Sequence, residues 1–166
     1  NKEYFQATCG GMGLTGMILD ATISLKKVPS AFISAQSIPA ANLEESLALL
    51  RQHNDKQYVV AWVDCLAKES ALGRGVIHLG SHSETGKLEH RSKRRLSMPF
   101  TTPGFLLNRY TMGGFNQLYY ARHRFKKSVN SVYYDDYFFP LDSLKGWNRL
   151  YGSEGFLQYQ FVLPDD

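Results

Sequence analysis

The 166-residue sequence has only two cysteines, Cys9 and Cys65, and neither belongs to a closely spaced cysteine pair or zinc motif. This scarcity disfavours a disulfide framework, although a single bridge between the two stays open. Isolated thiols inside hydrophobic segments are more typical of small buried side chains, which is what we expect here.

Long apolar runs are also lacking. No stretch approaches the roughly 18 apolar residues that a membrane-spanning helix needs. The longest uncharged run, residues 28–43, contains Pro29 and Pro39 and is predicted to be loop and strand edge. The first residues do not combine a basic start with an apolar block, as a signal peptide would. There is no initiator methionine, which fits a piece of a longer protein.

What the chain does contain is typical of a globular domain. Hydrophobic residues make up 43% and charged residues 20% of the sequence, with 10 Phe, 10 Tyr and 2 Trp. This composition disfavours intrinsic disorder, collagen and coiled coils. At this length a single folded domain buries roughly 70% of its unfolded surface, which is enough for a sizeable core.

The net charge of +4 is unevenly distributed, because residues 87–95 and residues 122–127 each carry about that excess. Two basic clusters could face phosphates of nucleic acid, anionic lipid or a phosphorylated ligand. The alternative interpretation is a pair of solvated loops, since residues 87–95 show no apolar periodicity.

Hydrophobic periodicity predicts most of the secondary structure. Strict alternation over residues 17–25 indicates a half-buried strand. Residues 42–53 predict a helix, with Asn42 as its cap and Glu45 as the reciprocal partner. Two runs rich in β-branched residues, 57–64 and 74–82, predict strands that form a hairpin.

The second half of the chain continues this mixed pattern. Residues 87–102 are predicted to be loop and residues 115–125 helix. Asp142 is expected to cap a short helix over residues 143–151, and residues 156–163 alternate like a strand. The predicted fold class is therefore α+β, an antiparallel sheet with helices packed on one face.

Few local patterns carry a defined chemistry. Gly11, Gly13 and Gly16 satisfy the GxGxxG spacing, but they lead into a predicted strand rather than a helix, which argues against a Rossmann site. Glycines there still allow the main chain to approach a ligand or, equally, a neighbouring strand. The five histidines show no metal-ligand spacing, no metal site is predicted, and hydrolase motifs are lacking.

Two further features are open to a functional or a structural interpretation. Gln158 and Gln160 share one face of the predicted terminal strand, where their amides could bind sugar or phosphate oxygens or simply face solvent. Trp62 shares a face with Tyr58 and Asp64, and could line a pocket or belong to the core.

Several segments taken together resemble one family. They are TCGGMGLTGMI, AWVDCLA, LGRGVI and FFPLDSLKGWNRLYGSEGFLQYQFVLP. In order and spacing they resemble the FAD-dependent decaprenylphosphoryl-β-D-ribose 2-oxidase family, among the vanillyl-alcohol-oxidase-type flavoproteins. The terminal segment is the most specific part of the resemblance, and residues 82–112 are the poorest match.

The resemblance implies two domains and a set of site residues. Residues 1–22 would be the C-terminal edge of the FAD-binding domain, and residues 23–166 an incomplete substrate-binding domain. The residues expected to contact FAD are Gly11, Gly13, Gly16, Met17 and Ile18. Those expected at the substrate pocket or its entrance are Trp62, Gln158, Gln160, Asp142, Trp147 and Arg149.

The resemblance also implies a function. Such enzymes oxidise a sugar hydroxyl, here expected on a polyprenyl-phosphate pentose, by hydride transfer to flavin. FAD would be bound mainly by segments absent from this chain, which holds no catalytic residue and is expected to be inactive alone. Expected partners are the lipid-linked sugar phosphate and the reductase partner of an epimerase, in the cytoplasm or peripheral to the inner membrane.

The basic residues would then lie near an anionic lipid surface; these are Lys93, Arg94, Arg95, Lys126 and Lys127. The alternative function is a non-catalytic basic module that binds nucleic acid or other polyanions. It is the weaker interpretation, because the basic residues are not interleaved with aromatic side chains on a stacking platform, and no nucleic acid is expected as a partner.

Overall fold

The computed structural model describes residues 1–89, 96–125, 129–152, 155, 157, 159 and 160, and its elements alternate between helices and strands. The α-helices are α1 (Lys2–Thr8), α2 (Leu43–Gln52), α3 (Arg109–Phe125) and α4 (Tyr134–Phe138). The strands are β1 (Phe32–Ala40), β2 (Tyr58–Val63), β3 (Gly75–His82), β4 (Leu96–Ser97), β5 (Val129–Tyr133) and β6 (Leu144–Lys145). Short 3₁₀ helices are η1 (Glu69–Ala71), η2 (Gly104–Leu106), η3 (Pro140–Ser143) and η4 (Trp147–Tyr151).

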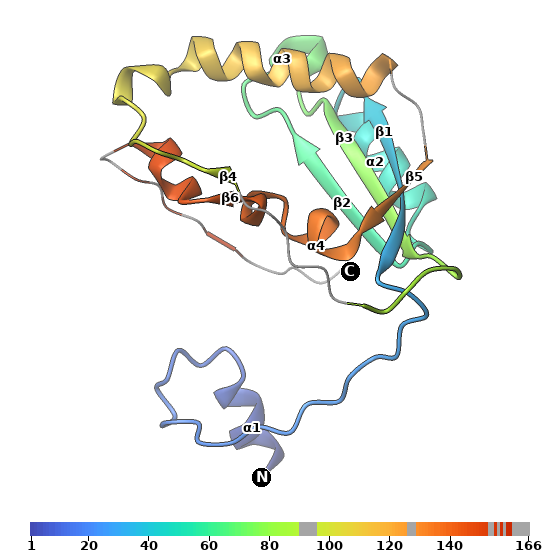
Figure 1. Ribbon diagram of the computed structural model, residues 1–166, viewed down its shortest axis with the longest axis vertical. Helices are drawn as coiled ribbons and strands as arrows, with labels where there is room; N and C mark the ends of the chain where they lie inside the picture. Colours follow the sequence, from blue (N-terminus) through green and yellow to red (C-terminus); the bar gives the residue numbers. More distant parts are fainter. Residues whose placement is uncertain (90–95, 126–128, 153–154, 156, 158, 161–166) are drawn as a thin grey trace.

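Four strands form the main sheet in the order β2-β3-β1-β5, with every neighbouring pair antiparallel (Figure 1). Helices α2 and α3 both contact β1 and β3, the two interior strands. The fully buried core lies on these strands and includes Ile33, Val76 and Ile77. The predicted α+β class is confirmed.

Local sequence signals account for the first helix on the sheet. The Asn42 side chain accepts a hydrogen bond from the Glu45 amide at 2.9 Å, and the Glu45 carboxylate accepts one from the Ala41 amide at 2.7 Å. The Asn42 half of the predicted capping box is present, while the reciprocal bond of Glu45 goes to the amide one residue before the cap rather than to that of Asn42. The predicted hairpin of residues 57–64 and 74–82 is also confirmed, as β2 and β3.

The strand predicted over residues 17–25 is wrong. This segment has no strand partner among the described residues and runs away from the sheet towards α1 (Figure 1). Its apolar side chains face solvent, with Met17 87% and Leu25 90% exposed. Alternation indicates which side chains could share a face, but a strand forms only where another strand satisfies its backbone groups.

The opposite error occurs in β1, which the two prolines suggested was loop and strand edge. It is an interior strand that pairs with β3 through Ala40 but with β5 only as far as Gln36. Pro39 therefore lies beyond the end of β5, where one side of β1 has no neighbouring strand in the described structure. Proline is tolerated at such a position because fewer ladder bonds are required.

The C-terminal predictions are corrected in two places. Instead of one helix over residues 143–151, the chain forms η3, β6 and η4, and Asp142 lies inside η3 rather than capping a helix. The predicted terminal strand falls largely on undescribed positions. Its described residues 157, 159 and 160 are exposed and not in a strand.

Two other expectations meet the structure. Cys9 and Cys65 are free and exposed, not the buried thiols that their hydrophobic surroundings suggested. The predicted loop over residues 87–102 contains the short strand β4, which pairs in parallel with β6. Within the described part of the chain, no helix has the length and apolar character required to cross a bilayer.

Candidate functional site

The N-terminal arm, residues 1–28, contains the residues predicted to contact FAD. Helix α1 and the extended residues that follow the glycines enclose a hollow of about 1000 Å³. Met17 and Ile18 line it together with apolar and aromatic side chains such as Tyr4 and Phe5. Gly11, Gly13 and Gly16 form the turn that connects the two sides of the hollow.

The glycine turn leaves its main chain open to approach. Gly13 and Gly16 have φ values of +78° and +135°, where a side chain would be strained, and a Cβ at either position would meet no atom within 4 Å. Gly11 differs, because a Cβ there would collide with the Ala7 carbonyl oxygen. A ligand could therefore approach the main chain at Gly13 and Gly16, between the exposed side chains of the same turn.

Trp62 lies on β2, half-buried against α3. The centroid of its ring is 4.6 Å from that of Tyr119. The Tyr119 hydroxyl is 3.2 Å from Nε2 of His78, and Nδ1 of His78 is 2.9 Å from the Ser37 hydroxyl. The orientation of Trp62 is thus supported by a chain of contacts that reaches β1.

His78 is the central group of this chain. Burial lowers its pKa from the ordinary value, and the neighbouring His123, with ring centroids 5.6 Å apart, lowers it further. Burial also raises the pKa of Tyr119. At neutral pH His78 is therefore an uncharged imidazole with a hydroxyl group at each nitrogen.

We expect this pKa shift to make folding stability depend on pH. A histidine whose folded pKa lies below its unfolded value of about 6.5 binds protons more readily in the unfolded chain. The contribution of His78 to the free energy of unfolding is therefore fully present above pH 6.5 and is lost as the pH falls through the folded pKa. Urea unfolding between pH 7.5 and 5 should show this decline, and the His78→Gln variant should show a shallower one. Equal slopes for the two proteins would contradict the prediction.

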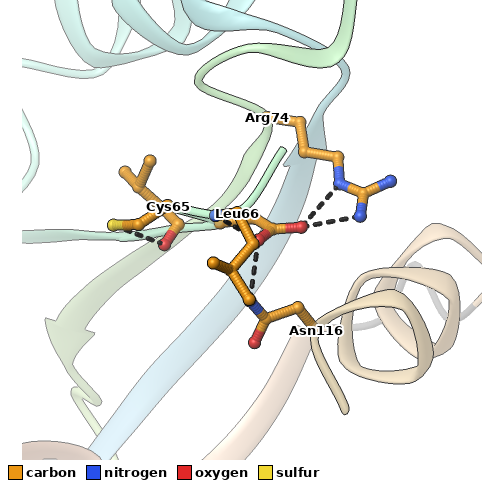
Figure 2. A network of polar contacts seen from close by, with 6 residues as sticks. Cys65, Leu66, Arg74 and Asn116 are labelled. Atoms are coloured by element: carbon orange, nitrogen blue, oxygen red, sulfur yellow. Dashed lines mark hydrogen bonds and ion pairs between the residues drawn. The ribbon is translucent and has the colours of Figure 1, made fainter. Parts of the chain in front are cut away.

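A buried carboxylate just after β2, at the same end of the strand as Trp62, joins the hairpin to α3. Asp64 is 2% exposed and accepts hydrogen bonds from Nε and Nη2 of Arg74 at 3.0 and 2.6 Å. It also accepts from the Asn116 side chain at 2.7 Å and the Leu66 amide at 3.0 Å. Figure 2 shows Arg74, from the turn before β3, and Asn116, from α3, reaching toward the segment after β2 that holds Leu66.

The predicted entrance residues lie in a different neighbourhood. Arg149 donates a hydrogen bond from Nη1 to the Met98 carbonyl at 2.9 Å, next to the β4 and β6 pair. Trp147 makes an edge contact with Tyr151, with centroids 6.1 Å apart, and Asp142 is exposed. Trp62 contacts α3 instead, so the described ring contacts and hydrogen bonds do not bring the two groups together.

The remaining predicted positions add little geometry. Gln158 lies outside the described residues, and Gln160 is exposed and not in a strand, so the expected amide ladder is not seen. The basic residues predicted to face lipid also lie outside the described residues; these are Lys93, Arg94, Arg95, Lys126 and Lys127.

The sequence reasoning missed the Asp64 network and the role of His78. A usable signal existed for the first. Asp64 is the last residue of one predicted strand and Arg74 the first of the next, so an antiparallel hairpin places them opposite each other. No comparable signal existed for Tyr119 and Asn116, because α3 is distant in sequence.

Comparison with known proteins gives the chain its relatives. It is 33% identical over 178 aligned positions to decaprenylphosphoryl-beta-D-ribose oxidase of Mycolicibacterium smegmatis, an alignment that covers 100% of this chain and 38% of the relative. It is 37% identical over 92 positions to a Streptomyces coelicolor protein described as "Uncharacterized protein in mprA 5'region", covering 55% of this chain and 25% of that protein. No family model matches. The chain thus spans well under half of the length of either relative. Along its whole length it is related in sequence to a segment of the decaprenylphosphoryl-β-D-ribose oxidase family, as its motifs predicted.

Proposed function

We propose that this chain forms part of the substrate domain of an FAD-dependent oxidoreductase. The enzyme would oxidise a hydroxyl group of a polyprenyl-phosphate pentose to a ketone. The observation that carries the proposal is the sequence relation to the mycobacterial oxidase over the entire chain. The ketone product would then need a reductase partner to complete an epimerisation.

The N-terminal arm supports a boundary between two domains. Residues 1–22 are proposed as the edge of the FAD-binding domain and residues 23–166 as the substrate domain. In support, the hydrogen bonds described for residues 1–22 remain within that segment. The exposed, alternating apolar side chains that follow the glycines would be covered if a longer protein supplied a neighbouring strand for this segment to pair with.

The arm also fits a flavin nucleotide. Gly13 and Gly16 expose main chain with open space where side chains would stand, and Met17 and Ile18 offer apolar surface beside them. FAD, when bound, would supply the hydride acceptor. These residues would contribute only binding, and the group that removes the hydroxyl proton is proposed to lie outside this chain.

On the substrate side, Trp62 would present a flat apolar surface to the sugar, held in orientation by Tyr119. We also propose that the substrate contacts five further residues, which are Asp142, Trp147, Arg149, Gln158 and Gln160. We further propose that the two basic clusters are attracted to an anionic lipid surface, and that the protein lies in the cytoplasm or at the periphery of the inner membrane.

The test uses the longer protein that carries this segment. We expect the purified protein to show flavin absorbance, which decaprenylphosphoryl ribose should bleach under anaerobic conditions. A colourless protein, or a flavin indifferent to that substrate, would refute the proposal.

A Trp62→Ala variant of the same protein should keep its flavin. We expect it to lose about tenfold in kcat/KM, because an aromatic contact of about 1.4 kcal/mol disappears. Phe105→Ala, which removes an exposed aromatic ring in η2, is the matched control and should behave like the parent. Equal kinetics for both variants would exclude Trp62 from the substrate site.

A further inference from the structure

Two adjoining hollows open at the end of β2, beside the buried Asp64. The larger, of about 420 Å³, is lined by Cys65, Leu66, Lys68, Arg109, Tyr110 and Gly113. The smaller, of about 330 Å³, shares Leu66, Lys68 and Gly113 with it and extends to Arg74. We call the two together the β2-end cavity.

The cavity carries unbalanced positive charge. Lys68 and Arg109 come from different segments, and neither forms an ion pair with any described residue. Asp64 is the sole carboxylate among the lining residues, and its oxygens are already bound by Arg74, Asn116 and the Leu66 amide. An anion in the cavity would therefore meet two free cations and no unsatisfied carboxylate.

The rest of the lining fits an organic group. The Leu66 side chain is half-exposed, and the Tyr110 ring lies beside Arg109, whose guanidinium carbon is 5.5 Å from the ring centroid. A Cβ at Gly113 would meet nothing within 4 Å, so this part of the wall is open. The volume of the larger hollow is within the range of small-molecule sites.

We propose that the β2-end cavity binds a phosphate ester. The phosphate oxygens would accept hydrogen bonds from Lys68 and Arg109, and the ester group would pack on Leu66 and Tyr110. Phosphate suits this lining because its oxygens are acceptors, whereas ammonium and guanidinium groups are donors only. The ester could be a lipid-linked phosphate or a free soluble one. The inference does not depend on the proposed oxidation, because it needs no flavin.

Cys65 provides a reporter inside the cavity, because its exposed thiol is part of the lining. The probe is the alkylation rate of this thiol by iodoacetamide in the full chain carrying Cys9→Ser, followed by mass spectrometry. Inorganic phosphate and farnesyl phosphate serve as the two ligands. We expect at least one to slow alkylation about fivefold or more, and the Lys68→Gln/Arg109→Gln double variant to abolish the protection.

Lys56→Gln is the control, since Lys56 lies just before the opposite end of β2 and should leave protection unchanged. Protection by farnesyl phosphate alone assigns a lipid-linked ligand, and protection by both assigns the phosphate group itself as sufficient. Absence of protection, or protection that survives in the double variant, overturns the proposal. Because both substituted residues are exposed, circular dichroism should confirm that the variant keeps its fold.

Discussion

Replacing Asp64 by alanine is expected to lower the free energy of unfolding by about 3 to 5 kcal/mol. The substitution would leave the Arg74 side chain, which is only 14% exposed, without its counterion. It would also remove the acceptor of the buried Asn116 side chain, so that α3 loses one of its polar attachments to the hairpin. Urea unfolding of the chain, followed by circular dichroism, measures the change.

The matched variant Asp64→Asn keeps the size of the side chain and removes its charge, and should cost less than the alanine variant. It should also flatten the acid limb of the stability profile. Burial alone raises the pKa of Asp64, but the hydrogen bonds from Arg74, Asn116 and the Leu66 amide lower it by more, so the net shift is downward. The unfolded carboxyl titrates near pH 3.9, so this stability is present above about pH 4 and lost as the pH falls through the folded pKa. An alanine variant that unfolds within 1 kcal/mol of the parent would show that the network is not stabilising.

Gly73→Ala should also be strongly destabilising, by about 2 to 4 kcal/mol. Two costs combine there. Gly73 has a φ of +72°, which strains any residue with a side chain, and the new Cβ would lie 2.6 Å from Cβ and 2.8 Å from Cα of Leu43. The first turn of α2 cannot easily yield, because the Ser46 hydroxyl donates to the Gly73 carbonyl at 2.9 Å and the Leu43 amide donates to that of Leu72 at 2.8 Å.

Gly146→Ala separates these two costs. Gly146 has nearly the same φ, +73°, but its nearest neighbour would be the flexible Arg149 side chain at 3.7 Å. This variant should therefore cost only the backbone term, about 1 to 2 kcal/mol. Thermal or urea unfolding of the two variants in parallel gives the comparison. Equal losses would mean that the contact with Leu43 relaxes freely.

The errors in the sequence-based prediction have a common cause. Residues 17–25 show cleaner alternation than β1, yet β1 is an interior strand and residues 17–25 are not in a strand. Alternation reports which side chains could share a face, and it does not report whether another strand lies alongside. The Asp142 error is of the same kind, because a helix-like pattern follows this residue in the sequence while the structure places it inside the 3₁₀ helix η3.

The sequence by itself determined the mixed class of the fold, the capped helix α2, the β2 and β3 hairpin and the relation to one oxidase family. Those features depend on neighbours within about ten residues or on the order of motifs, both of which are readable along the chain. Only the tertiary structure decided that α3 places Asn116 on Asp64 and Tyr119 against Trp62 and His78. Those contacts join residues 41 to 57 positions apart, and the packing of α3 on the sheet, which no local pattern specifies, is what brings them together.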